Sequence, residues 1–215
     1  MNTPPAARPI LRDRLSPPKQ ERTREAWERI VDAGMQIMLT EGREALSIAA
    51  VCKRAKVAPT AIYARVDGIA GLFWAIFERG LTQLKATYVE LIEQARQWPV
   101  NTHGRIEATV AAECQTFERN YNFLHPIIIY SLTDRDLSAR GAESSRLFVD
   151  NIAALLPQND PDAARDVARM LHQECVFRVM YGNQWLSMQP ESADDFKERL
   201  TKMAKARLAP YILEP

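Results

Sequence analysis

The sequence predicts an all-α fold, on three observations. Glycine is scarce, at 8 of 215 residues, and no segment alternates apolar and polar side chains as a half-buried strand does. Several long segments instead repeat apolar residues every three or four positions, which is the period of a helix with one buried face. A chain of this length can also bury a sizeable core.

The first long helix is expected over residues 24–42, REAWERIVDAGMQIMLTEG. One face carries the set Trp27, Ile30, Val31, Gly34, Ile37 and Met38 at helical spacing. Gly42 can end this helix, because glycine adopts the left-handed conformation of a C-terminal cap without a steric penalty.

Two short helices joined by a tight turn are expected next, between Ser47 and Leu72. Their apolar positions are Val51, Cys52 and Ala55 on the first helix, Val57 in the turn, and Ile62, Tyr63 and Val66 on the second. This spacing is typical of a helix-turn-helix, whose second helix enters the major groove of DNA. The long helix before it can cover both short helices and complete a three-helix core.

The rest of the chain is expected to form further helices, over residues 72–99, 106–121, 137–156, 161–185 and 192–211. A kink or break is expected at His125-Pro126, because proline lacks a donor and disfavours helix in the residue before it. Asp160-Pro161 is a helix start signal, with aspartate as the cap and proline at the first helical position.

Residues 22–81 resemble the DNA-binding domain of the TetR family of transcriptional regulators. The chain matches the family pattern at Gly42, Ser47, Val51, Ala55, Val57, Ile62, Tyr63, Val66 and Leu72. The resemblance implies an N-terminal helix-turn-helix three-helix domain over residues 19–68. It also implies a C-terminal helical ligand-binding and dimerisation domain over residues 69–215.

Three positions depart from the family pattern. Cys52 stands where alanine is usual. Lys56 replaces the usual glycine of the turn, so a positive φ there would strain the backbone by about 1–2 kcal/mol. Ile69 replaces the usual lysine that touches phosphate, and Lys56 could supply a nearby positive charge instead.

The resemblance places the recognition helix at about Pro59 to Arg65. The candidate DNA-binding residues are Ser47, Pro59, Thr60, Ala61, Tyr63, Ala64 and Arg65. Thr60 and Arg65 can bond base edges or phosphates, and the two alanines can pack on thymine methyl groups. Tyr63 matches the family's phosphate-contacting tyrosine, and the alternative is a core aromatic. Ser47 can bind phosphate at a helix N-terminus or serve only as an N-cap.

The resemblance also implies an effector pocket in the second domain. The candidate ligand-binding residues are Phe117, Tyr121, His125, Phe148 and Phe177. Aromatic side chains around a few polar groups suit an apolar or aromatic small molecule, and the alternative is that these residues are ordinary core. No cofactor is expected, and the histidines at 103, 125 and 172 lack the spacing of metal ligands.

The helix beginning at Pro161 carries two apolar stripes, one of which needs a further partner. In the TetR family the last two helices pair with their copies across a two-fold axis, which implies a homodimer. The candidate interface residues are Leu171, Cys175, Val179, Leu200 and Met203. The alternative is that both stripes lie inside one monomeric core.

Residues 1–18 are expected to form a flexible arm, because they contain five prolines and no apolar period. Arg8, Arg12 and Arg14 could reach phosphates or the minor groove, or the arm could be a solvated tail. Residues 1–67 carry 12 Lys and Arg against 8 Asp and Glu, a net charge of +4, whereas the remainder carries −3. This asymmetry suits a DNA-binding part joined to a part with another role.

The sequence therefore predicts a cytoplasmic DNA-binding transcriptional regulator that is not an enzyme and does not bind a membrane. The family's commoner mode implies a repressor, released from a palindromic operator by a small apolar or aromatic ligand. No GxSxG, HExxH, P-loop or GxGxxG motif supports an enzyme. A helical partner-binding protein, or a ligand-binding enzyme without DNA readout, is the alternative.

Overall fold

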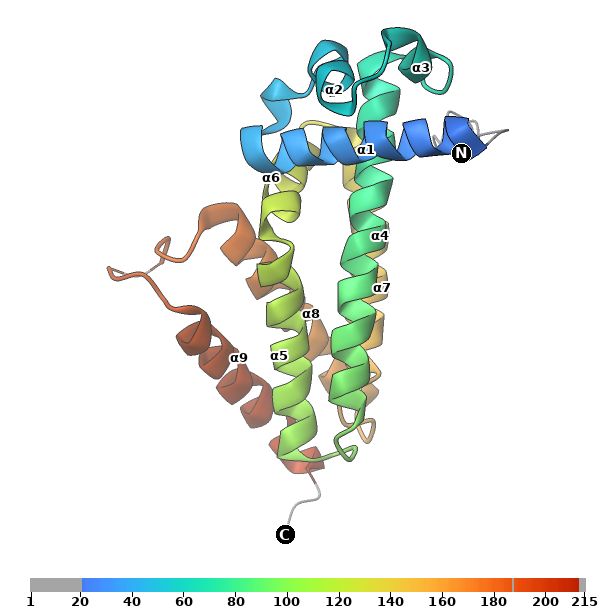
Figure 1. Ribbon diagram of the computed structural model, residues 1–215. Helices are drawn as coiled ribbons and strands as arrows, with labels where there is room; N and C mark the ends of the chain where they lie inside the picture. The colour runs from blue at the N-terminus through green and yellow to red at the C-terminus, as the bar shows by residue number, and fades with distance from the viewer. Residues whose placement is uncertain (1–20, 187, 213–215) are drawn as a thin grey trace, which may run out of the picture. The chain divides into compact units, whose positions relative to one another are not determined.

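The computed structural model describes residues 21–186 and 188–212, and this part of the chain contains helices and no strand (Figure 1). The helices are α1 (Glu21–Glu41), α2 (Ile48–Ala55), α3 (Pro59–Tyr63), α4 (Gly68–Arg96), α5 (His103–Arg119), α6 (Tyr121–Ser131), α7 (Arg135–Ala153), α8 (Pro161–Tyr181) and α9 (Ala193–Leu208). The predicted all-α fold is confirmed. The arm predicted over residues 1–18 lies outside the described residues.

The chain divides into two compact units, Met1–Gln83 and Leu84–Pro215. The division falls inside α4, whereas the sequence placed it at residues 68/69, before that helix. The first turns of α4 bury Leu72, Phe73, Ile76 and Phe77, and Arg79 bonds Asp32 of α1 at 3.0 Å. These turns therefore belong to the core of the first unit.

The apolar face predicted for α1 forms that core. Ile30, Val31 and Ile37 are almost completely buried. Gly34 lies against Ile76 of α4, where a Cβ atom would overlap the isoleucine side chain. Glycine at this position therefore lets the backbone of α1 approach α4 closely.

The turns of the first unit depend on a few local contacts. Ser47 is the N-cap of α2, and its hydroxyl accepts a hydrogen bond from the Ala50 amide at 3.2 Å. Lys56 ends α2 in the left-handed conformation, with φ of 54° and ψ of 51°. Gly42 has a positive φ of 87°, a conformation that favours glycine, but its ψ of 173° lies outside the left-handed helical region, so it is not the left-handed cap that the sequence suggested.

In the second unit α8 packs against α5, α6, α7 and α9, and α9 also packs against α5. The break after α5 lies at Asn120, five residues before the one predicted, and Pro126 lies within α6. The Asn120 side chain donates to the Thr116 carbonyl at 2.8 Å and so satisfies an acceptor at the end of α5.

Aspartate and serine caps set the starts of the last two long helices. Asp160 accepts a hydrogen bond from the Ala163 amide at 3.0 Å, and Ser192 accepts one from Asp195 at the same distance. α8 ends at Tyr181 before Gly182, whose φ is 80°, so it is shorter than predicted. No helix in the described ranges has both the length and the apolarity needed to cross a bilayer.

Candidate DNA-binding surface and ligand cavity

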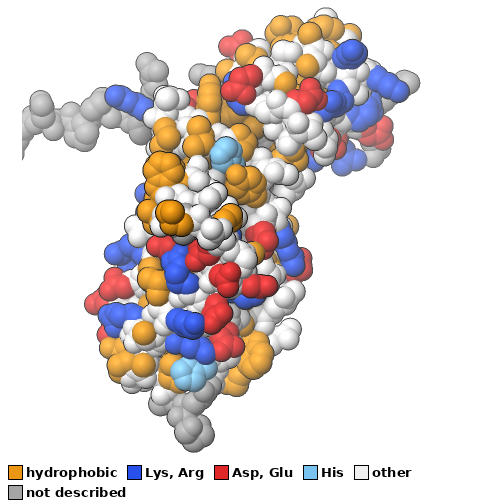
Figure 2. Space-filling model, turned by 90° about the vertical axis from the view of Figure 1, so that its left-hand side faces the viewer, with side chains coloured by type: hydrophobic (Ala, Val, Ile, Leu, Met, Phe, Trp, Pro, Cys, Tyr) orange, Lys and Arg blue, Asp and Glu red, His pale blue; other side chains and the backbone are white. Residues whose placement is uncertain are grey.

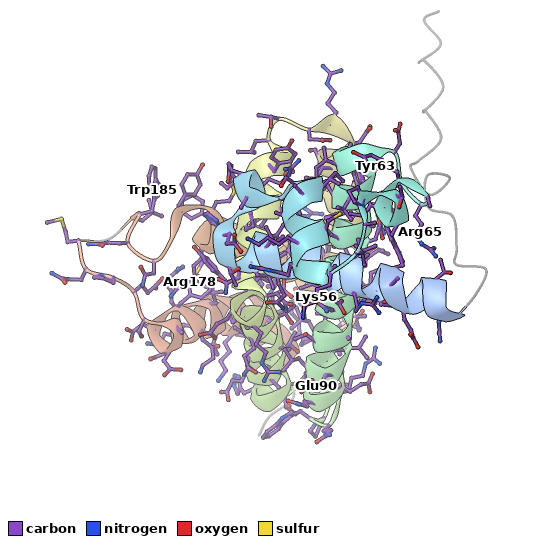
Figure 3. The ribbon with its side chains drawn as sticks, turned by 45° about the horizontal axis from the view of Figure 1, so that its top comes forward. Lys56, Tyr63, Arg65, Glu90, Arg178 and Trp185 are labelled. Carbon is purple, nitrogen blue, oxygen red and sulfur yellow. The ribbon has the colours of Figure 1, made fainter. Side chains whose placement is uncertain are left out.

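The helix-turn-helix presents a small polar surface at α3. Tyr63 is 59% exposed, which excludes the alternative that it is a core aromatic. Pro59, Thr60 and Ala64 are also exposed and Ala61 is half-buried, whereas Ile62 is fully buried. The short helix thus anchors itself through one residue and leaves most of the predicted DNA-binding side chains on the surface (Figure 3).

Basic and capping groups lie at the two ends of α2. Ser47 is exposed and caps the first turn, so its two predicted roles are compatible. Lys53 and Lys56 are exposed near the other end, and Arg54 pairs with Glu41 at 2.5 Å. Two separate anions, such as two phosphates, could therefore bind here, one at the backbone amides that begin α2 and one at Lys56 in the turn.

Arg65 does not belong to this exposed surface, contrary to the prediction. Its side chain is only 8% exposed, and one guanidinium nitrogen donates to the Thr23 carbonyl at 3.0 Å. The guanidinium also lies 5.5 Å from the centre of the Trp27 ring. Arg65 therefore fastens the end of α3 to the first turns of α1, because its long side chain reaches back across the unit.

A cavity of about 280 Å³ lies among α5, α8 and α9 in the second unit. Phe117 and Tyr121 line it, as predicted for the ligand-binding set. Its other lining includes Cys114, Cys175, Arg178, Val179 and Phe196. The hydrogen bond that the Cys175 thiol donates to Cys114, and then burial, raise the pKa of Cys175, so this thiol stays protonated.

The other predicted ligand residues do not join this cavity. His125 stacks on Tyr121, with ring centres 5.4 Å apart, but it does not line the space. Phe148 lines a different groove, between α4 and α7. Phe177 lies beside Tyr181 on the outer side of α8, with ring centres 4.7 Å apart. The five predicted aromatic residues therefore do not share one site, because they lie on four different helices that face different neighbours.

The same bundle contains a buried polar pair that the sequence did not predict. Glu113 is fully buried, and one of its carboxylate oxygens lies 2.8 Å from Nδ1 of His172. The rings of Phe117 and Phe148 flank the imidazole. The second carboxylate oxygen and His172 Nε2 have no partner within the described chain. The available signal was a glutamate at core spacing between Val110 and Phe117.

The pKa of Tyr88 of α4 is also changed by burial and by this pair. Burial, and then the nearby Glu113 carboxylate, raises the pKa of the Tyr88 phenol well above its usual range. The phenol hydroxyl donates to the Phe148 carbonyl at 3.2 Å. Tyr88 is therefore a neutral hydrogen-bond donor at physiological pH, and it links α4 to α7.

No protein-family model and no curated protein matches the sequence. Solved structures do match. A protein from Mesorhizobium loti described as a TetR-family transcriptional regulator aligns with a TM-score of 0.69 at 14% identity, covering 90% of this chain and all of that one. The chain has the fold of the TetR-family regulators. The fold that the resemblance implied is thereby confirmed.

Two further structures with the TetR fold align over similar lengths. A TetR-family regulator from Streptomyces coelicolor has a TM-score of 0.59 at 16% identity, covering 87% of this chain and 90% of that one. The multidrug binding protein EbrR, in complex with imidazole, has a TM-score of 0.57 at 17% identity, covering 86% and 96%. These alignments include both units of the chain.

Within this TetR fold, most of the residues predicted for a dimer interface are internal. Leu171, Cys175, Val179 and Leu200 are at most 3% exposed, because they form the contact of α8 with α5 and α9 in one chain. They cannot also form an exposed interface. Met203, at 41% exposed, is the one predicted residue that remains on the surface.

Proposed function

We propose that the protein is a DNA-binding transcriptional regulator that acts as a homodimer and responds to a small apolar or aromatic ligand. The observation that carries the proposal is the exposed α3 surface, with Thr60 and Tyr63, on a helix-turn-helix within a TetR fold. A helix presented in this way reads base edges in the major groove.

Each exposed side chain has a part in this interaction. Tyr63 and Ser47 bind phosphates, Thr60 bonds a base edge or a phosphate, and the alanines contact thymine methyl groups. Lys56 supplies the phosphate contact that Ile69 cannot make. Since Arg65 is engaged with α1, few side chains remain to read bases directly, and DNA shape contributes to recognition.

The dimer forms through the outer side of α8 and the segment that follows it. Phe177, Tyr181 and Trp185 make a ladder of rings with centres 4.7 Å apart at each step, and Tyr181 and Trp185 are 44% and 62% exposed. Figure 2 shows hydrophobic side chains gathered in the middle of this face, above a zone of mixed charges. Exposed apolar surface of this kind marks a protein contact.

The effector binds in the cavity among α5, α8 and α9. Phe117 and Tyr121 give it aromatic walls and Arg178 gives it a polar group, which suits a compact aromatic molecule. The multidrug binding protein EbrR has the same fold, and its described role is consistent with ligand binding in this unit.

The mechanism is release of a palindromic operator by the ligand, which makes the protein a repressor. α4 supplies residues to both units, and its Tyr88 bonds α7, which packs on α8 at the wall of the cavity. A ligand that displaces α8 can therefore shift the second half of α4 through α7 and change the spacing of the two recognition helices in the dimer. Half-sites lie about 34–36 Å or a multiple apart, so a small change in spacing loses contacts. Coupling of about 1–3 kcal/mol corresponds to a roughly 5–150-fold change in affinity.

The DNA-binding part is tested by titrating the protein against labelled DNA from upstream of its own gene. Tyr63→Phe removes only the hydroxyl and should weaken specific binding about tenfold, since a hydrogen bond to a charged group is lost. Lys202→Ala, at an exposed position of α9, is the surface control and should leave the affinity for DNA unchanged. Absence of specific retention for the unmodified protein would favour a partner-binding protein instead.

The dimer is tested by light scattering at micromolar concentration. Trp185→Glu should give a folded monomer, because it places a charge in an exposed apolar contact. Leu171→Glu should instead unfold the chain, since this side chain is completely buried. A monomer mass for the unmodified protein would refute the dimer.

A further inference from the structure

A second groove, outside the proposed effector cavity, lies between α4 and α7 of the second unit. It encloses about 260 Å³ and shares no lining residue with the cavity among α5, α8 and α9. Its walls come from residues 85–96 of α4 and residues 144–151 of α7. The residues that line its two ends differ in chemical character.

The middle of the groove is apolar and open to solvent. The rings of Tyr88 and Phe148 meet edge to face at its base, with centres 4.4 Å apart. Val89 of α4 and Leu147 of α7 line the groove, and their side chains are 57% and 51% exposed. Two large apolar side chains facing water across an aromatic base form a surface that gains free energy when an apolar group covers it.

One end of the groove contains a buried hydroxyl without a partner. Ser144 is only 5% exposed and lines the groove, and its Oγ atom makes no hydrogen bond within the described chain. A buried polar atom that makes no hydrogen bond is destabilising, so such groups usually have a partner. A ligand atom that accepts or donates a hydrogen bond in the groove would be that partner.

The same end carries a positive charge. α4 and α7 run in the same direction (Figure 1), and Lys85 and Ser144 each precede the Tyr88 and Phe148 pair by about one turn. Lys85 is exposed and forms no ion pair with the described residues. At the opposite end the charge of Arg96 is compensated by Glu93 at 2.6 Å. The uncompensated positive charge of the groove therefore lies at the end that contains Ser144.

We propose that this groove is a second ligand site, which binds a small amphipathic carboxylate with an unbranched or aryl apolar part. The carboxylate accepts hydrogen bonds from Ser144 Oγ and from the Lys85 ammonium. The apolar part lies along Val89, Ile92 and Leu147, over the Phe148 ring. The carboxylate chemistry follows from two donors, one of them cationic, at one end of an otherwise apolar groove.

The first experiment is calorimetric titration of the full-length protein with butyrate, hexanoate and octanoate. Each added methylene should tighten binding about fourfold while the groove has room, because each buries apolar surface. Octanol and octylamine are the matched probes without a negative charge, and both should bind at least tenfold more weakly than octanoate. Affinity that does not depend on chain length, or octanol binding as tightly as octanoate, would overturn the proposal.

Variants locate the site. Lys85→Gln and Ser144→Ala should each weaken octanoate binding about tenfold without affecting octanol. Lys202→Gln is the control for general charge, and Phe117→Ala, in the other cavity, should leave octanoate affinity unchanged. If Phe117→Ala abolishes octanoate binding and Lys85→Gln has no effect, the ligand occupies the effector cavity and this site is refuted.

Val89→Trp provides a test that does not depend on the polar end. Val89 is exposed, so a larger side chain there can fill the groove without disturbing the core, and octanoate binding should be lost. DNA binding is not needed for any of these measurements, so they stand apart from the proposed regulatory function. A change of oligomeric mass on Val89→Trp, with no octanoate binding to the unmodified protein, would show that another protein chain covers the groove.

Discussion

Replacing Lys56 by glycine should stabilise the protein, because Lys56 holds a backbone conformation that favours glycine. Its φ of 54° and ψ of 51° place it in the left-handed region at the end of α2. That conformation costs a residue with a Cβ about 1–2 kcal/mol. Glycine removes this cost but makes the unfolded chain more flexible, which offsets about 0.4–1 kcal/mol.

The net gain expected for Lys56→Gly is about 0.5–1 kcal/mol in the free energy of unfolding. For a chain of this size it corresponds to a rise of about 1–4 °C in the melting temperature. Urea denaturation followed by circular dichroism measures the free energy, and thermal unfolding gives the midpoint. The hydrogen bond from the Val57 amide to the Cys52 carbonyl, at 3.1 Å, needs no side chain and should persist in the variant.

Two controls separate backbone strain from other effects. Lys56→Ala removes the same charge but keeps the Cβ, so it should give little or none of the gain. Lys53→Gly makes the same substitution inside α2 and should destabilise by about 0.5–1 kcal/mol. If Lys56→Gly destabilises as much as Lys53→Gly, the inferred strain is absent. Both Lys56 variants should lower the salt dependence of DNA binding by about one phosphate contact.

Three further outcomes are expected. Arg65→Gln should lower the free energy of unfolding by about 1–3 kcal/mol in urea denaturation, and a loss of DNA affinity at unchanged stability would contradict its structural role. Glu113→Leu should also destabilise by about 1–3 kcal/mol, whereas the double variant with His172→Phe should recover most of the loss; equal destabilisation by both would refute this. The hydrogen bond from Tyr211, at 2.6 Å, holds the pKa of Asp160 below its ordinary value of about 3.9. Stability from Asp160 is therefore present above that value and lost as pH falls through the lower pKa of the folded state, and Tyr211→Phe should weaken this dependence in acid titrations.

The sequence alone determined the fold class and the helix-turn-helix of the first unit. Helical spacing identified the buried face of α1, and Ser47, Asp160 and Ser192 marked helix starts because a cap acts on the amides of its own first turn. The resemblance placed Lys56 where the turn usually has glycine, and its positive φ follows from the local geometry of that turn. Such features depend on neighbours in the chain, and the residues themselves carry the information.

The roles of individual side chains depended on packing between helices. Arg65 follows the recognition helix directly, yet it reaches back to α1, which the spacing of α3 does not reveal. Of the two apolar stripes on α8, the one through Leu171 is internal, whereas the one through Tyr181 is buried at Val167 and exposed at its C-terminal end. Periodicity identifies that a stripe exists, but which neighbour covers it is decided by the arrangement of all the helices.

The polar groups of the second unit show the same limit. Glu113 and His172 are 59 residues apart, and only the packing of α5 on α8 brings them to 2.8 Å. Ser144 and Lys85 are ordinary helix residues in sequence and become one end of a groove only because α4 and α7 lie side by side. The sequence fixes local conformation through short-range contacts, whereas binding sites are made from residues distant in the chain, whose proximity the tertiary structure decides.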